Sequence, residues 1–184
     1  MTNDSNGLLP KNFADQSCNL FAPPCSLELG NSGFSVPRGF LRAKDGTITV
    51  NVDPANTFSS DPGAINPDGT IAGPYQDDIT GAWHCFLRNK HGVFTTFDIP
   101  GARIIFSATL NQGGAVAGTF QDASAVFHGF VRAGHGTVTT TIAAPGAGTS
   151  FFQGTFVRGI NPAGTITGRY TDASFTSHGF VRTK

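Results

Sequence analysis

The stretch Ile65-Asn-Pro-Asp-Gly-Thr-Ile-Ala-Gly-Pro-Tyr-Gln-Asp77 is found three times along the 184-residue chain, in related forms. It returns as Leu110-Asn-Gln-Gly-Gly-Ala-Val-Ala-Gly-Thr-Phe-Gln-Asp122 and as Ile160-Asn-Pro-Ala-Gly-Thr-Ile-Thr-Gly-Arg-Tyr-Thr-Asp172. Each copy begins with a turn rich in Asn and Gly and continues into a short run typical of a β-strand. Recurrence at a fixed period predicts a repeat architecture.

A second motif follows each copy and returns at a similar spacing. Its sequence is His-Gly/Cys-Phe-Leu/Val-Arg, and it covers His84–Arg88, His128–Arg132 and His178–Arg182, with a related run at Arg38–Arg42. Successive side chains of a strand point to opposite faces. Phe86 and Leu87 are both apolar, so each face of this strand carries an apolar side chain. Such a strand must be covered on both faces, as the blades of a β-propeller are.

The repeats predict an all-β fold, namely a small β-propeller of four or five blades built from tandem units of about 45 residues. An antiparallel β-barrel is the alternative. We expect one domain over residues 1–184, with an N-terminal closing segment at 1–33 and repeats at 34–64, 65–109, 110–159 and 160–184. Residues 8–36 are expected to close the ring by pairing the start of the chain with its end; otherwise two chains complete each other.

Composition supports strands and excludes several function classes. The chain has 24 Gly, 11 Pro and 17 Phe, and Glu28 is its only glutamate, which disfavours helices. Its 12 basic and 12 acidic residues cancel, so we expect neither nucleic-acid nor membrane binding. Residues 1–10 lack the features of a signal peptide, and no run is apolar enough to span a membrane.

The three cysteines are expected to have structural roles. Cys18 and Cys25 bracket a Pro-Pro turn and could close a small disulfide loop in an oxidising compartment. Cys85 stands where the other copies have glycine, so we interpret it as a packed thiol.

Three repeated Asp and His pairs are the candidate catalytic residues. In each pair the Asp ends one strand and the His begins the next, so a hairpin brings them within hydrogen-bonding reach. One interpretation is structural, in which the Asp holds the imidazole and ties the loop. The others are acid–base catalysis by one pair, or a metal held by three converging imidazoles, although we assign no metal and no cofactor. The pairs are Asp77 and His84, Asp122 and His128, and Asp172 and His178.

The loops between these strands carry aromatic residues that could bind a ligand. Trp83, Phe127 and Phe175 could stack on sugar rings, one site per unit, or else cap the hydrophobic core. The first copy has Arg38 in place of His, which makes one unit chemically different and adds Arg38 to the candidate ligand-binding residues.

The repeated motifs resemble the bacterial extracellular repeat known as the HAF repeat. The resemblance covers about residues 34–184 and rests on Ile-Asn-x-x-Gly-x-Ile-x-Gly-x-Tyr-x-Asp, on His-Gly-Phe-Leu, and on Phe97–Ala102. It implies a propeller-like fold and an extracellular or cell-surface setting. It brings no catalytic residues with it.

The function these features favour is a non-catalytic binding module, either lectin-like or an interaction scaffold with repeated loop sites. Its expected partner is a glycan or a small molecule, and the expected assembly is a monomer or a homodimer. The alternative is a small propeller enzyme, a hydrolase or lyase, that uses the Asp and His pairs at one mouth of the ring.

Overall fold

A computed structural model describes residues 36–50, 52–134 and 139–183, and these residues form strands and turns with no helix. The prediction of an all-β chain is therefore confirmed. The N-terminal segment 1–33 and the Cys18–Cys25 loop lie outside the described residues. None of the described residues forms a helix long and apolar enough to cross a membrane.

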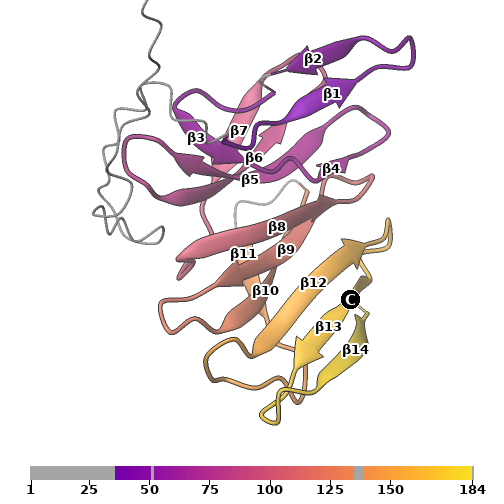
Figure 1. The fold of residues 1–184 in the computed structure, drawn as a ribbon. Coiled ribbons are helices and arrows are strands. Elements are labelled where there is room, and N and C mark those ends of the chain that lie inside the picture. The colour runs from indigo at the N-terminus through magenta and orange to yellow at the C-terminus, as the bar shows by residue number, and fades with distance from the viewer. Residues whose placement is uncertain (1–35, 51, 135–138, 184) are drawn as a thin grey trace, which may run out of the picture. The chain divides into compact units, whose positions relative to one another are not determined.

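The described strands fall into three hydrogen-bonded sheets (Figure 1). A two-stranded sheet contains β1 (Phe40–Arg42) and β2 (Ile48–Val50). A five-stranded sheet contains β3 (Thr57–Ser60), β4 (Ala64–Ile65), β5 (Ile71–Asp77), β6 (Trp83–Arg88) and β7 (Phe94–Phe97). A seven-stranded sheet contains β8 (Ile104–Leu110), β9 (Val116–Gln121), β10 (Phe127–Arg132), β11 (Thr139–Ile142), β12 (Gly154–Ile160), β13 (Ile166–Thr171) and β14 (Ser177–Arg182).

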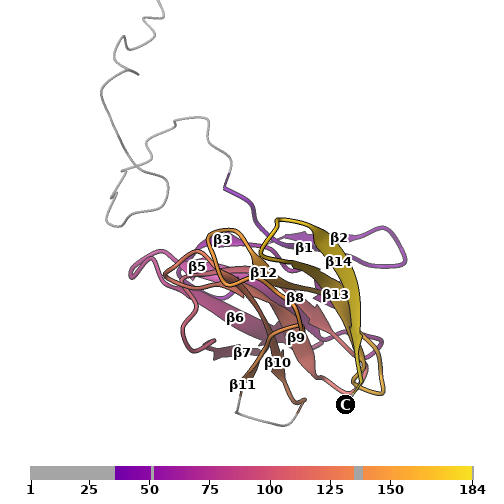
Figure 2. The ribbon, with the colours of Figure 1, turned by 90° about the horizontal axis from the view of Figure 1, so that it is seen from below.

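Within these sheets, successive segments of the chain form antiparallel meanders. β3 and β4 both pair with β5, which pairs with β6 and then β7, and the same order is seen in β8–β9–β10–β11 and in β12–β13–β14. The seven-stranded sheet joins two meanders through a single parallel pairing between Phe127 and Gly154. Figures 1 and 2 show that the strands of one meander are rotated relative to those of the next. We call these meanders units 1, 2 and 3, and the β1–β2 hairpin unit 0.

The Asn-containing turn of the first motif is built as the sequence predicted. Asn66 Oδ1 accepts hydrogen bonds from the backbone N–H groups of Asp68 and Thr70, at 3.1 and 2.9 Å. Asn111 and Asn161 each accept one from the backbone N–H four residues later, at 2.9 Å. The turns join β4 to β5, β8 to β9 and β12 to β13, so the strand that precedes the Asn pairs with the strand that follows it.

The glycine in the middle of the same motif is required by a close backbone approach. A Cβ on Gly118 would lie 2.0 Å from the carbonyl oxygen of Ser107 on the neighbouring strand, and one on Gly168 would lie 2.0 Å from that of Phe156. A Cβ on Gly73 would meet the backbone of Asp61 and Pro62 within 3 Å. The cross-strand partner of each glycine is the motif phenylalanine, whose ring lies over it in units 2 and 3.

Three hydrophobic clusters lie between successive units and use opposite faces of the His-Gly-Phe strand. Phe86 belongs to a cluster that includes Leu41 of unit 0, whereas Cys85 packs on its other side with Phe130 of unit 2. Phe86, Cys85 and Phe130 are each completely buried. The expectation that this strand is covered on both faces is therefore met in unit 1. Cys85 is a packed thiol whose pKa is raised by burial.

Candidate functional site

Two of the three predicted Asp and His pairs form hydrogen bonds inside their own hairpins. His128 Nε2 lies 2.7 Å from Asp122 Oδ2, and His178 Nε2 lies 2.8 Å from Asp172 Oδ2. The other carboxylate oxygen, Oδ1, accepts two backbone N–H groups of the turn in each case, at 2.8 to 3.0 Å. Each carboxylate therefore closes the turn and orients the imidazole at the same time.

The third predicted pair is not formed. His84 Nδ1 lies 2.5 Å from Asp98 Oδ1, at the end of β7, and does not bond to Asp77. Asp77 Oδ1 instead accepts hydrogen bonds from the backbone N–H groups of Ile79 and Thr80 and from the Thr80 hydroxyl. The reason is the β5–β6 turn, which is one residue longer than the β9–β10 turn, so its carboxylate is used within the turn.

Each of the three imidazoles contacts a neighbouring aromatic ring, and two of them are stacked on it. His128 stacks on Phe120 at 5.1 Å between ring centroids, and His178 stacks on Tyr170 at 4.9 Å. His84 lies 5.3 Å from Tyr75. In the part of the chain that the structure describes, no three His, Cys, Asp or Glu residues come together to hold a metal ion. The geometry therefore favours the structural interpretation of these pairs.

These hydrogen bonds should make stability sensitive to acid. Burial alone would raise the pKa of Asp122, but the hydrogen bonds from His128 and from the turn amides outweigh it, so the pKa lies below the ordinary value of 3.8. For Asp172 the hydrogen bond from His178 is the main cause of a lowered pKa. A carboxylate with a lowered folded-state pKa contributes stability above its unfolded-state pKa, and this contribution is lost as the pH falls through the folded-state value.

We expect Asp122→Asn to flatten the loss of unfolding free energy on acidification from about pH 5 to pH 2. Urea unfolding at several pH values measures this slope. Asp78→Asn is the matched control, since the Asp78 side chain accepts no hydrogen bond from the described residues. Equal slopes for Asp122→Asn and the unmodified chain would contradict the assigned role of this carboxylate.

The predicted ligand-binding aromatics do not form equivalent loop sites. Phe127 is buried at the start of β10, and Trp83, at the start of β6, is half-buried against the core between units 1 and 2. Phe175 lies in a turn and is exposed. The alternative that such residues cap the core applies to Trp83, which packs against the cluster between units 1 and 2. Arg38 lies beside Phe40 in a shallow apolar depression on unit 0.

An exposed aromatic patch lies around Phe127 and was not predicted. It consists of Phe106, Phe151 and Phe152, whose exposed fractions are 47%, 61% and 53%. Phe106 and Phe152 contact the Phe127 ring at 5.3 and 6.0 Å between centroids, and Phe151 packs edge-on against Phe152 at 4.2 Å. The signal in the sequence was the group of extra residues around 148–152 in the third copy.

The loop that carries Phe151 and Phe152 is held in a strained conformation by buried contacts. Phe152 has a φ of 60°, a value that glycine adopts readily but that is uncommon for a residue with a bulky side chain. Its backbone N–H donates to the Ala125 carbonyl at 3.0 Å. The neighbouring Gln153 is buried, accepts from the Ser150 N–H and donates to the Ala173 carbonyl. Phe175 has a similar φ of 62°, so it is the base of buried contacts, and not the φ value alone, that distinguishes the loop with Phe151 and Phe152.

Comparison of the chain with protein-family models, curated proteins and solved structures finds no match.

Proposed function

We propose that this protein is a non-catalytic binding module whose contact surface is the aromatic patch of Phe106, Phe151 and Phe152. The observation that supports it most is the strained loop, which holds Phe151 and Phe152 at the surface on a base of buried contacts. Covering exposed apolar rings with a partner lowers the free energy of the complex, and a rigid platform loses little entropy on binding.

The ligand class that we propose is a glycan. Aromatic side chains bind the apolar faces of sugar rings by stacking, while nearby hydroxyl groups bond to the polar edges. Thr149 and Ser150 are exposed beside Phe151 and supply such hydroxyls. This proposal retains the lectin-like function but replaces repeated loop sites with one patch, because Trp83 packs against the core and Phe127 is buried under the patch.

A glycan array on the full chain, followed by titration of the best ligand, tests the proposal. We expect Phe151→Ala to weaken binding by about tenfold, because removing a central aromatic contact typically costs more than 1 kcal/mol. Phe40→Ala is the matched control, since Phe40 is 64% exposed on unit 0 and is not part of the patch. Phe175→Ala tests the earlier loop-site prediction in the same assay.

Two results would contradict the proposal that the aromatic patch is the binding surface. One is saturable binding that survives both Phe106→Ala and Phe151→Ala, and the other is an array with no saturable ligand. Loss of binding in Phe175→Ala alone would restore the loop-site interpretation.

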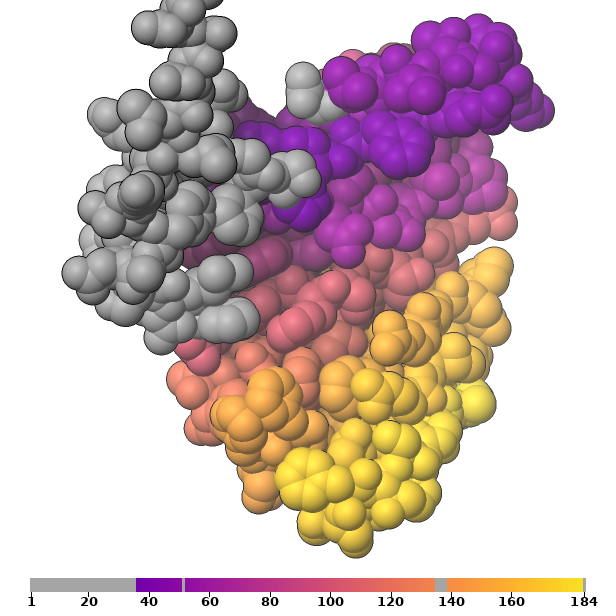
Figure 3. Space-filling view, in the orientation of Figure 1, coloured from indigo at the N-terminus to yellow at the C-terminus, as the bar shows by residue number. Residues whose placement is uncertain are grey.

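We also propose that units 0 to 3 are blades of a four-bladed propeller. Each contact between successive units joins the Phe face of one unit to the opposite face of another. Among the described residues, apolar side chains are exposed on one face of unit 0, with Phe40 and Val50, and on one face of unit 3, with Val181, which is 69% exposed. Figure 3 shows these units as the indigo and yellow ends of the described chain. Closure of the ring would bury both faces.

The extracellular setting and the kinship with HAF-repeat proteins remain proposals that rest on the motif resemblance. The enzyme alternative can be tested by screening hydrolase and lyase activity in His84→Ala, His128→Ala and His178→Ala. We expect no turnover that depends on any of these histidines, because they are not gathered into one site with other His, Cys, Asp or Glu residues in the described part of the chain.

A further inference from the structure

A hollow with charged residues at its rim lies where the first strands of units 1, 2 and 3 approach one another. The segment between β3 and β4, together with β8 and β12, lines a solvent-open hollow of about 170 Å³. Gly63, Ala108 and Val157 also line the hollow, and the last two belong to the buried clusters between units. Small side chains at these positions leave the hollow open between the three segments.

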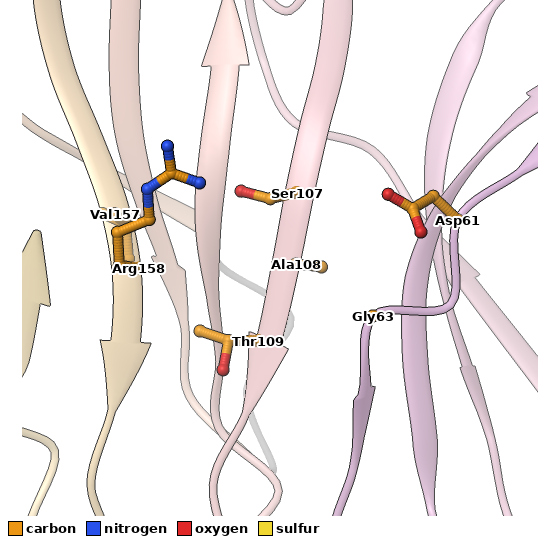
Figure 4. A pocket seen from close by; sticks show the side chains of 7 residues that line it. All are labelled: Asp61, Gly63, Ser107, Ala108, Thr109, Val157 and Arg158. Carbon is orange, nitrogen blue, oxygen red and sulfur yellow. The ribbon is translucent and has the colours of Figure 1, made fainter.

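Opposite charges face each other across this hollow. Figure 4 shows the Arg158 guanidinium and the Asp61 carboxylate extending toward each other from opposite sides, with Ser107 between them. Both charged residues are exposed. Within the described part of the chain, neither side chain has a hydrogen bond or an ion pair. They are therefore available to a ligand.

The geometry points to a binding site for a short zwitterion that carries a carboxylate at one end and an ammonium group at the other. The planar guanidinium of Arg158 matches a carboxylate through paired hydrogen bonds. Asp61 accepts hydrogen bonds from the ammonium group. The hydroxyls of Ser107 and Thr109, which also line the hollow, provide polar contacts between the two ends.

Size and charge both restrict the ligand class. A cavity of about 150 Å³ holds a molecule as large as benzene, so this hollow suits a ligand of similar size, such as a short ω-amino acid. A simple anion would pair with Arg158 and be repelled by Asp61. A simple cation would pair with Asp61 and be repelled by Arg158. Only a ligand with separated opposite charges is complementary to both.

This site is independent of the aromatic patch, since none of the three patch residues lines the hollow. The experiment is calorimetric titration of the full chain with γ-aminobutyrate, δ-aminovalerate and ε-aminocaproate, with butyrate, butylamine and glucuronate as comparison ligands. We expect saturable binding of at least one ω-amino acid. Arg158→Gln and Asp61→Asn should each weaken it about tenfold, as expected for the loss of one charge-assisted hydrogen bond.

Arg182→Gln is the matched control, because Arg182 is exposed on β14 and does not line the hollow. Thermal unfolding of each variant checks that exposed charge-to-amide changes leave the fold intact. The inference is overturned if none of the three ω-amino acids binds, or if Asp61→Asn leaves their binding unchanged. Preferential binding of glucuronate that needs Arg158 but not Asp61 also overturns it, since the site would then bind acidic sugars.

Discussion

Phe130→Ala is expected to lower the free energy of unfolding by about 3–5 kcal/mol, because it removes a fully buried ring and leaves a cavity. Phe130 lies over Gly118 and belongs to the cluster that joins units 1 and 2. Its loss therefore weakens a unit and the contact between units together. Denaturant unfolding followed by tryptophan fluorescence measures the change, because Trp83 packs against the same cluster.

The repeat itself provides the control for this prediction. Phe40 occupies the same motif position in unit 0 but is 64% exposed in the open arrangement of units, where Phe40→Ala should change stability by no more than about 0.5 kcal/mol; closure of the ring would raise that cost. Equal losses for the two substitutions would show that the contacts described for Phe130 do not distinguish it. A large loss for Phe40→Ala alone would instead support burial of the unit 0 face by ring closure.

Gly118→Ala is the second substitution with a large expected effect. The added Cβ would lie 2.0 Å from the Ser107 carbonyl oxygen and 2.6 Å from the Phe130 ring. A backbone carbonyl in a paired strand cannot turn away, so β8 must separate from β9. We expect a loss of about 3 kcal/mol, at the upper end of the cost of overpacking.

Gly179→Ala is the matched control for this substitution. A Cβ on Gly179 has nothing within 4 Å, and the residue lies in a strand, so alanine should be tolerated there. Thermal and urea unfolding of both variants separate the effect of close approach from the intrinsic effect of replacing glycine in a strand. Tolerance of alanine at both positions would contradict the close approach of β8 to Gly118.

Much of the local structure could be predicted because the information is contained in short stretches. The Asn turns need only an amide oxygen a few residues before the N–H groups that it accepts, as at Asn66. The Asp122–His128 and Asp172–His178 bonds follow from one hairpin of fixed length. The prediction for His84 failed because one extra residue changed the turn and brought in Asp98, a partner from the next connection.

The candidate binding surfaces could not be predicted, because their residues are distant in the chain. Phe106 and Phe152 are joined through Phe127, and Asp61 of unit 1 faces Arg158 of unit 3 across β8 of unit 2. The repeat period and the alternation of apolar and polar residues along the strands do not predict which unit carries an exposed loop. Likewise, the motif phenylalanine is buried at Phe86 and Phe130 but exposed at Phe40, although the motif is nearly the same.

From the sequence alone came the all-β class, the repeated motifs, the turns and the strand faces, since these depend on contacts between near neighbours and on alternation along a strand. The tertiary structure alone decided which faces are covered, which aromatic residues remain exposed and which charges meet. Burial and electrostatic complementarity are properties of surfaces assembled from distant segments, and the packing of one unit against another brings those segments together.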